Sequence, residues 1–385
     1  MKITGVETIR VAIPPRRAHR VTFDRAGIMG RYVILKLQTD QGILGLGEAT
    51  VLPMWGGDHM RYFGESPGTT VHIVTDYLVP AIVGQDPFDI EAIHAIMDRT
   101  VKGYPYAKAA IDMALYDIMG KALGVPAYRL LGGLSRPEAR LAHSLGIMET
   151  AEAVAEATAV VQEGIRTIKV KVGIDPERDV EVVRALRKAL GPEIEITVDA
   201  NQGYTSAKVA IRTILRMCEH GITMAEQPVE GLDGMAEVRA AVPCLVMADE
   251  SAWTPHDILE IKAKQAADVF SLYTTKPGGL FKAKKVAAVA EACGMACNVN
   301  GSIETGVGNA ANLHLVVSTG IVTLANVFPI TTLQGRAQTK LAGIYYLDDI
   351  VTEPFPYANG ALRVPDRPGL GIELDEERLA RYRVG

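Results

Sequence analysis

Three acidic residues recur along the chain, each directly after a short apolar run: Asp199 in ITVDAN, Glu226 in TMAEQP and Asp249 in LVMADE. Neighbouring members of this set lie roughly 25 residues apart, the length that one strand, one helix and two loops occupy in a β/α barrel. Polar residues that end successive barrel strands converge at the C-terminal mouth of the barrel. Three carboxylates gathered there would repel one another unless a hard divalent cation lay between them. The spacing therefore predicts a metal-dependent enzyme with a Mg²⁺ or Mn²⁺ site.

Two lysines precede the acidic set by a similar interval. Lys169 and Lys171 lie in the run TIKVKVG and share one face of a strand, because strand side chains alternate. Two ammonium groups at a barrel mouth are costly unless binding or catalysis uses them. Mutual repulsion and partial burial favour a lowered lysine pKa, which makes a competent base. The alternative is that both lysines only neutralise the carboxylates.

Three further polar residues accompany these sets. Tyr273 stands about one repeat after Asp249, in the run VFSLYTTKPGG. Glu250 points away from Asp249 if the strand continues, so we expect it to support the site from behind. Asn201 follows Asp199 by two positions and either lines the site or turns the chain.

The composition limits the class of protein. The chain has 385 residues, of which 48% are hydrophobic, and its alternating strand-like and helix-like segments indicate a soluble α/β protein. A net charge of −5 gives no reason to expect nucleic acid or an anionic membrane surface. The chain has no signal-peptide core and no apolar run long enough to span a membrane. We expect a reducing, cytoplasmic compartment and buried free thiols, since no metal-ligand spacing relates Cys218, Cys244, Cys293 and Cys297.

The chain divides into two kinds of segment. Residues 1–13 and 31–48 read as antiparallel strands, and helical periodicity follows, most clearly in AKAAIDMALYDIMGKALG. An α+β domain is therefore expected over residues 1–130. The barrel is expected over residues 131–346, and the turn-rich tail 347–385 is expected to pack back on the first domain.

Eight strands with intervening helices can be counted in the second part, which is the number that a β/α barrel needs. One of the helices has clear start signals, because Asp175 precedes Pro176 and an acidic residue. The strand candidates are 141–147, 167–172, 195–200, 224–228, 245–250, 268–273, 296–300 and 323–328.

The motifs KVKVG, VDAN, AEQP, MADES, KPGG and GSIETGVGNAA together resemble the enolase superfamily. The likeness is specifically to the muconate-lactonizing branch of the mandelate racemase/muconate lactonizing enzyme family, and it covers essentially the whole chain. The resemblance implies a modified TIM-type barrel with an α+β capping domain formed by the N-terminal third and the C-terminal tail. It also implies a Mg²⁺ or Mn²⁺ ion on Asp199, Glu226 and Asp249, and a small carboxylate substrate that reacts through an enolate.

The resemblance assigns roles to further residues. It implies that Lys171 transfers the proton, and that Lys169 lies beside the substrate carboxylate and holds down the pKa of Lys171. Glu304 matches an acid that contacts the substrate or the enolate. Trp55, in PMWGG, lies in a segment that resembles a specificity loop, and either a mobile lid or simple packing explains it. The family also implies a homo-oligomer, possibly an octamer.

Two departures from the family pattern bear on the reaction. Members of this branch carry a second lysine in a K-x-x-K-x-G-G pattern, but Tyr273 stands at that position and Lys276 matches the later, non-catalytic lysine. A phenol with a pKa near ~10 is a poor base at neutral pH, and racemisation needs groups on both faces of the α-carbon. The run 298–300 lacks the histidine of the mandelate racemase and acid-sugar dehydratase branches, which disfavours them.

These features favour a muconate-cycloisomerase-like enzyme that uses Lys171 alone for proton transfer. The same site also suits a dipeptide epimerase, an N-acyl or N-methyl amino-acid epimerase, or a syn-dehydratase. A non-catalytic binding descendant is the remaining alternative, which the intact acidic set and both lysines disfavour.

Overall fold

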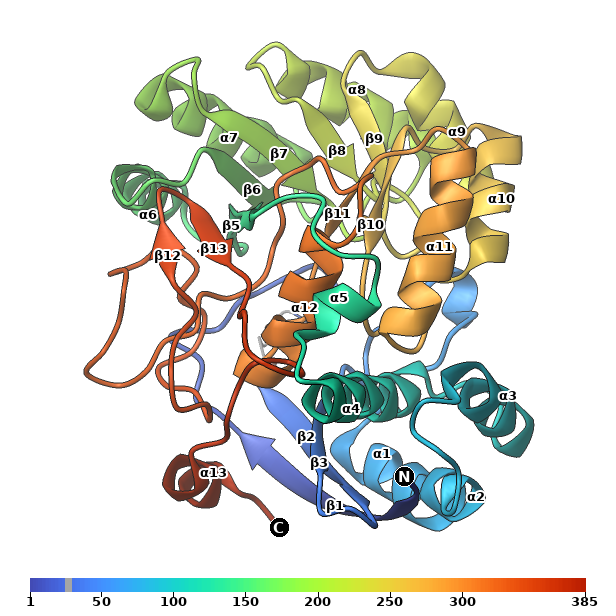
Figure 1. Ribbon diagram of the computed structural model, residues 1–385. Helices are drawn as coiled ribbons and strands as arrows, with labels where there is room; N and C mark the ends of the chain where they lie inside the picture. Colours follow the sequence, from blue (N-terminus) through green and yellow to red (C-terminus); the bar gives the residue numbers. More distant parts are fainter. Residues whose placement is uncertain (25–29) are drawn as a thin grey trace.

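An antiparallel sheet begins the chain, in the computed structural model that describes residues 1–24 and 30–385 (Figure 1). Strand β2 (Arg31–Thr39) pairs with both β1 (Ile3–Ala12) and β3 (Leu44–Thr50), so the order is β1-β2-β3. This arrangement confirms the strands expected for the first part of the chain.

Helices cover this sheet, and the long helix α4 (Pro105–Leu123) packs directly on β3. Gly47 on β3 makes the close approach possible, because a Cβ atom there would lie 1.8 Å from the carbonyl oxygen of Ala110. The other elements of this region are the 3-10 helix η1 (Asp58–Met60), α1 (Pro67–Ile73), the π-helical turn η2 (Val74–Leu78), α2 (Val79–Ile82), α3 (Ile90–Thr100) and α5 (Ala127–Leu130).

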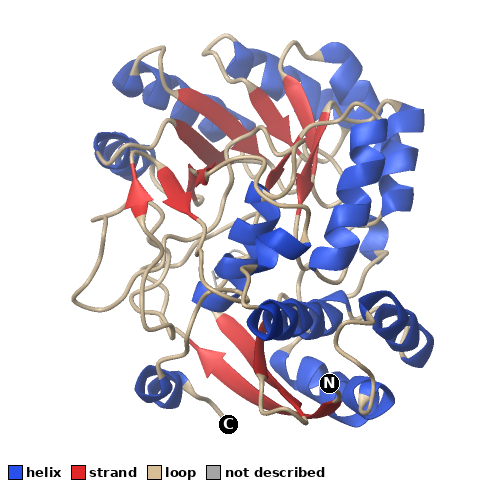
Figure 2. Ribbon diagram, viewed as in Figure 1, coloured by secondary structure: helices blue, strands red, loops and turns tan. Residues whose placement is uncertain are grey.

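Seven parallel strands form the second sheet, and helices enclose it on the outside (Figure 2). The strands neighbour one another in chain order: β5 (Ala142–Leu145), β6 (Thr167–Lys171), β7 (Glu195–Asp199), β8 (Met224–Glu226), β9 (Leu245–Ala248), β10 (Val269–Leu272) and β11 (Cys297–Val299). The helices between and after them are α6 (Thr150–Gln162), α7 (Pro176–Leu190), α8 (Ala207–Cys218), α9 (Leu232–Ala241), α10 (Pro255–Lys264), α11 (Leu280–Ala292) and α12 (Gly306–Val317). Seven of the eight predicted strands are therefore confirmed, with shorter bounds.

The eighth predicted strand, 323–328, does not form a regular strand. Single parallel bridges join Asn326 to Leu141 and Val327 to Asn300, so the segment still connects the last strand to the first. Backbone bonds hold this segment on both sides, since the Asn326 N–H donates to the Arg140 carbonyl at 2.8 Å and the Val327 N–H donates to the Val299 carbonyl at 3.1 Å. The side chain of Asn326 adds to them, because it accepts from the Val299 N–H at 2.8 Å and donates to the same Arg140 carbonyl at 2.9 Å. The barrel is thus closed by a few backbone bonds and one amide side chain.

The C-terminal tail 347–385 returns to the first sheet, as Figure 1 shows. Leu347 N–H donates to the Pro14 carbonyl at 3.1 Å, and Val384 N–H donates to the Arg10 carbonyl at 2.9 Å. The tail also contributes β12 (Tyr357–Ala358), β13 (Ala361–Arg363), which pairs with β4 (Glu138–Arg140) beside the barrel, and α13 (Glu376–Tyr382). The domain limits 1–130 and 131–346 stay a prediction.

Acidic residues of the first region bind the starts of two barrel helices. Asp112 on α4 accepts from the Leu280 N–H at the start of α11, and Glu48 on β3 accepts from the Gly308 N–H in the first turn of α12 at 2.9 Å. A carboxylate is favourable at a helix N-terminus, where the N–H groups are free. These contacts fix the first region over the barrel. Within the described part of the chain, no helix is both long and apolar enough to cross a membrane.

Candidate active site

The three predicted acidic residues lie together at the ends of neighbouring strands. Asp199 ends β7, Glu226 ends β8, and these two residues are direct partners in the parallel register. Asp249 directly follows β9, the next strand of the sheet. All three side chains are buried, with at most 2% of each residue exposed. The spacing argument therefore located these residues correctly, whereas their role as ligands stays a prediction.

Both lysines point from β6 toward these carboxylates, which confirms that they share a face. Lys169 Nζ donates to Glu226 Oε1 at 2.7 Å and lies 2.8 Å from Asp199 Oδ2. Lys171 Nζ donates to the same Asp199 oxygen at 2.6 Å and to Asn201 Oδ1 at 2.8 Å. Asn201 in turn donates to Glu250 Oε1 at 2.9 Å, so Glu250 contacts Lys171 only through Asn201, and its supporting role stays a prediction.

The pKa values follow from burial and from these pairs. Burial lowers the pKa of Lys169, but the charges of Asp199, Glu226 and Asp249 outweigh it and hold that pKa well above its usual range. The three carboxylates therefore keep the Lys169 ammonium group charged, which agrees with a role for Lys169 as fixed positive charge. Burial, and then the charge of Asp199, raise the pKa of Glu226 to about 8.

Asp249 is held by a third ammonium group. Lys276 Nζ donates to Asp249 Oδ1 and to its carbonyl oxygen, each at 2.8 Å, and to the Ser271 carbonyl at 2.9 Å. These three acceptors match the three hydrogens of the ammonium group. Tyr273 Oη lies 3.5 Å from Asp249 Oδ2, at the outer limit of a hydrogen bond. Burial, and then the charge of Asp249, raise the pKa of Tyr273 well above its usual range, so its hydroxyl stays protonated.

In the described ranges 1–24 and 30–385, no three His, Cys, Asp or Glu side chains are gathered into a ready-made metal cage. The three carboxylates bind ammonium groups instead. Their chemistry nevertheless fits a hard divalent cation, because carboxylate oxygens are its preferred ligands and Asp199 and Glu226 end adjacent strands. The pKa of Glu226 is raised first by burial and then by the charge of Asp199, and a cation between the carboxylates would offset both effects.

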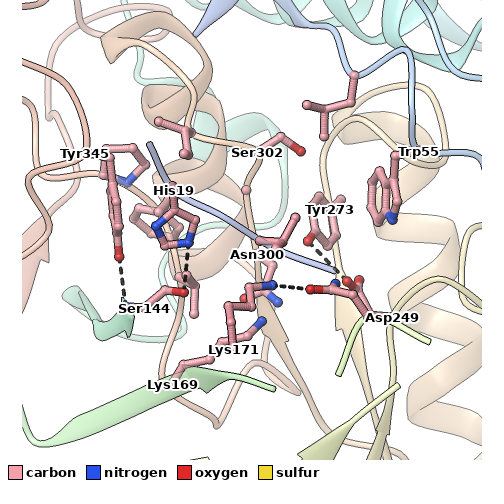
Figure 3. A pocket seen from close by; sticks show the side chains of 18 of the residues that line it. His19, Trp55, Ser144, Lys169, Lys171, Asp249, Tyr273, Asn300, Ser302 and Tyr345 are labelled. Atoms are coloured by element: carbon pink, nitrogen blue, oxygen red, sulfur yellow. Dashed lines mark hydrogen bonds between the residues drawn. The ribbon is translucent and has the colours of Figure 1, made fainter. Parts of the chain in front are cut away.

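A cavity opens above these residues, between the barrel and the first region (Figure 3). Lys169, Lys171 and Asp249 lie at one end, and Ser302 lies across the cavity from the two lysines (Figure 3). Its wall carries both polar and apolar side chains: His19, Val21, Phe23, Leu52, Trp55, Ser144, Asn201, Tyr273, Asn300, Ile303, Val327, Phe328, Pro329 and Tyr345.

Sequence reasoning missed one wall of this cavity. His19 Nε2 lies 3.3 Å from Ser144 Oγ, and the Ser144 N–H donates to Tyr345 Oη at 2.9 Å. Burial, and then the charge of Lys171, lower the pKa of His19 to about 3, so this histidine is neutral. The three residues come from the first region, β5 and the segment before the tail. No spacing in the chain relates them, although Ser144 lies on a predicted strand.

Two arginines that precede His19 do not reach the cavity. Arg16 Nη2 and Arg17 Nη2 both bind Glu156 Oε1 at 2.8 Å, on helix α6. The two arginines therefore have a structural role, because they bind the segment that carries His19 to the barrel helix α6.

Glu304 was expected to contact the substrate or the enolate, and Trp55 was expected either to belong to a mobile lid or to pack. Trp55 does line the cavity, and its ring packs at 5.3 Å from that of Tyr273. Glu304 is not among the residues that line the cavity. Its Oε1 accepts from the Ser302 N–H at 2.9 Å, on the loop that follows strand β11. Gly301 leaves room for this carboxyl, because a Cβ atom there would lie 2.0 Å from Glu304 Oε2. The structure thus places Glu304 behind the cavity wall.

Two protein-family models match the chain. Residues 4–132 match "Mandelate racemase / muconate lactonizing enzyme, N-terminal domain", and residues 152–378 match "Enolase C-terminal domain-like". The N-succinyl-L-Arg/Lys racemase of Bacillus cereus is 34% identical, with 100% of this chain and 98% of the relative covered. Muconate cycloisomerase 1 of Rhodococcus opacus is also 34% identical, with coverages of 99% and 98%.

Solved structures agree with these matches. Muconate lactonizing enzyme from Pseudomonas fluorescens, complexed with muconolactone, superposes with a TM-score of 0.89 at 33% identity, covering 99% of each chain. A dipeptide epimerase from Enterococcus faecalis, complexed with Mg and the dipeptide L-Leu-L-Tyr, gives 0.85 at 30% identity, covering 97% of this chain and 100% of that one. The chain therefore belongs to the mandelate racemase/muconate lactonizing enzyme family of the enolase superfamily, and it is an isomerase of that superfamily.

Proposed function

We propose that the protein is a divalent-metal-dependent cycloisomerase of the muconate type, in which Lys171 transfers the proton. The observation that carries this proposal is the difference between the two sides of the cavity. Lys171 supplies an amine on one side, and Tyr273 stands where the family pattern has a second lysine. A cycloisomerase needs proton transfer on one face only, whereas a racemase or epimerase needs a group on each face.

Lys276 does not restore the missing second base. Its ammonium group donates to Asp249 and to the Ser271 carbonyl, and it is not among the residues that line the cavity. Tyr273 is a phenol, which can donate a hydrogen bond but accepts a proton from carbon poorly at neutral pH. The two side chains together favour a one-base reaction.

Asp199, Glu226 and Asp249 would hold the cation, and Mg²⁺ or Mn²⁺ suits their oxygen ligands. A divalent ion at this place supplies positive charge that stabilises the substrate carboxylate as negative charge develops on it. The Enterococcus faecalis relative was solved with Mg, which agrees with a divalent ion here.

The residues of the chain account for the proton and for part of the charge. One carboxylate oxygen of an unsaturated diacid adds to a carbon of the double bond, and the electron pair of that bond moves toward the other carboxylate as an enolate. Lys171 then gives a proton to the α-carbon, so that the product is an isomer of the substrate. Lys169 lies 2.8 Å from the same Asp199 oxygen as Lys171, and it adds fixed positive charge beside the developing anion.

A racemase or epimerase is the second candidate, because the Bacillus cereus racemase is as similar to this chain as the cycloisomerase is. The two candidates are separated by a screen with Mg²⁺ or Mn²⁺ against cis,cis-muconate, N-succinyl-L-arginine and a set of dipeptides. We expect lactone formation from muconate, and its loss in Lys171→Ala. Inversion of N-succinyl-L-arginine or of a dipeptide, with no reaction of muconate, would reject the cycloisomerase. A lack of any reaction and of any metal binding would favour the non-catalytic alternative.

A further inference from the structure

One residue of the cavity wall has a strained backbone. Ile303 has a φ angle of 64°, in the left-handed region, and it lines the cavity. A β-branched residue rarely adopts this conformation, because its side chain collides with the backbone. Such strain persists only where the surrounding structure enforces it.

A tyrosine of the first region binds this strained residue. Tyr32 Oη donates to the Ile303 carbonyl at 2.7 Å, and Tyr32 is fully buried on β2. The hydrogen bond joins two segments that lie far apart in the sequence. It is therefore a contact between the first region and the loop that follows strand β11.

The same face of the first sheet binds the loop a second time. Glu48 on β3 accepts from both the N–H and the hydroxyl of Thr305, and from the Gly308 N–H at 2.9 Å. In the antiparallel register Tyr32 pairs with Thr50, and Glu48 lies two positions from Thr50 on the same strand. Because side chains of a strand alternate, Tyr32 and Glu48 lie on the same face of neighbouring strands. The sheet thus presents two polar side chains to the segment 303–308.

The loop is also anchored on its barrel side. The Gly301 N–H donates to the Val327 carbonyl at 2.9 Å, and the Ser302 N–H donates to Glu304 Oε1 at 2.9 Å. Since Ser302 lies across the cavity from Lys169 and Lys171 in Figure 3, this loop forms the wall that is remote from the lysines.

We propose that Tyr32 is a positioning residue, whose hydroxyl holds Ile303 in its left-handed conformation and so sets the cavity wall opposite the two lysines. This wall would contact the part of the substrate that does not react. The placement of the substrate rests on the proposed function, whereas the effect of Tyr32 on the loop does not.

The variant Tyr32→Phe removes the hydroxyl and keeps the ring. We expect KM to rise by roughly three- to tenfold, the range that one hydrogen bond of ordinary strength gives. The kcat should stay within about twofold, because Tyr32 does not touch the reacting atoms. Tyr116→Phe, at another buried tyrosine of the first region, serves as the matched control and should leave both constants unchanged.

Hydrogen exchange measures the loop without any substrate. Peptides that cover residues 300–308 should exchange faster in Tyr32→Phe than in the native protein, and no faster in Tyr116→Phe. A merely structural loss would instead raise exchange evenly over β1, β2 and β3. Unchanged exchange at 300–308, or an even rise over the sheet, would overturn the assignment of Tyr32 even if the enzyme proves to be a cycloisomerase.

Two substitutions at Ile303 test the strained backbone itself. Ile303→Gly should give a higher midpoint of thermal unfolding than Ile303→Ala, because glycine alone adopts a positive φ without strain. The usual order, in which alanine is the more stable, would contradict the left-handed conformation. Neither stability nor exchange needs turnover, so failure of the proposed reaction and failure of this inference give different results.

Discussion

One carboxylate oxygen binds Lys171, the lysine that we propose transfers the proton. Asp199 Oδ2 accepts from Lys171 at 2.6 Å and lies 2.8 Å from Lys169, while Asn201 binds Lys171 from its other side and Glu250 binds Asn201. This chain of contacts fixes the direction in which the Lys171 amine points. We therefore infer that Lys171 moves the proton and that Asp199 and Asn201 orient it.

Lys171→Ala tests that claim most simply. We expect turnover to fall by at least about a thousandfold, because no other described amine lines the cavity except Lys169 on the same strand face. Exchange of the α-proton with solvent should be lost to the same extent, while metal content and the unfolding midpoint are kept. Lys169→Ala is the comparison, and it should change the pH profile through lost charge without removing the exchange entirely.

Asp249→Asn tests the metal site. It removes one anionic oxygen from the ligand set, so bound Mg²⁺ or Mn²⁺, measured by elemental analysis after gel filtration, should fall together with turnover. Glu250→Gln is the matched control at the adjacent position and should retain most of the metal. Full metal content in Asp249→Asn would show that this carboxylate is not a ligand.

The sequence predicted some of these residues and not others, for a physical reason. Asp199, Glu226 and Asp249 follow strands at a regular interval, so their convergence can be read from the period of the barrel. His19 and Tyr345 reach the cavity from loops without such a period, and their places depend on how those loops pack. The same limit applies to Glu304, whose side chain turns under a glycine-containing loop, so its contact with the substrate stays a prediction.

At the scale of elements, strand periodicity predicted seven barrel strands and failed at the eighth. The apolar pattern of 323–328 predicts a strand, but it does not show that only single bridges will form there. The backbone of Asn326 binds the Arg140 carbonyl, and its side chain accepts from the Val299 N–H on the opposite side. Closure of the barrel therefore combines backbone bonds with one amide side chain, which the pattern did not predict.

Asn326→Ala should lower the free energy of unfolding by about 1 to 3 kcal/mol, because it leaves the buried Val299 N–H without its partner, whereas the Arg140 carbonyl keeps the backbone N–H of residue 326. Urea unfolding followed by circular dichroism measures this loss. Gln41→Ala, in the exposed turn between β2 and β3, should change the free energy by less than about 0.5 kcal/mol. A loss as small as this in Asn326→Ala would mean that backbone bonds and packing close the barrel without the side chain of Asn326.

At the scale of the whole molecule, buried acids lie where the first region, the barrel and the tail meet. Burial raises the pKa of Glu48 to about 8, of Glu304 to about 7 and of Asp349 to about 6. Glu48 and Asp349 both accept from N–H groups in the first turn of α12. The junction therefore keeps protons that the unfolded chain would release at neutral pH.

The sign of the resulting pH dependence follows from these protons. The native state binds more protons than the unfolded state above pH 6.5, so the free energy of unfolding should fall as the pH rises from 6.5 to 8. Glu48 alone accounts for at most about 1.4 kcal/mol per pH unit in this window. Buried neutral histidines such as His19, with a pKa of about 3, make the free energy of unfolding rise with pH instead. They do so only below about pH 6.5, where the unfolded histidine binds a proton that the native one does not. Chemical unfolding across this range, with chelator present, should show a smaller slope in Glu48→Gln, and an unchanged slope would contradict the assignment.

Family resemblance also implies a homo-oligomer, possibly an octamer, and this stays a prediction. Light scattering on the purified protein at several concentrations measures it. A mass equal to one chain of 41.4 kDa at every concentration would contradict it.

We expect proton transfer on one face of the enolate only, the face that strand β6 presents. Turnover of the substrate in D₂O with Mg²⁺ or Mn²⁺, followed by NMR of the α-carbon, measures it directly. We expect deuterium at a single stereochemical position of the product. The variant Tyr273→Phe should lose only about tenfold in rate and should give the same stereochemistry. Deuterium that enters from both faces in the native enzyme would contradict the one-base mechanism and favour an epimerase, with Tyr273 or Lys276 as the second acid.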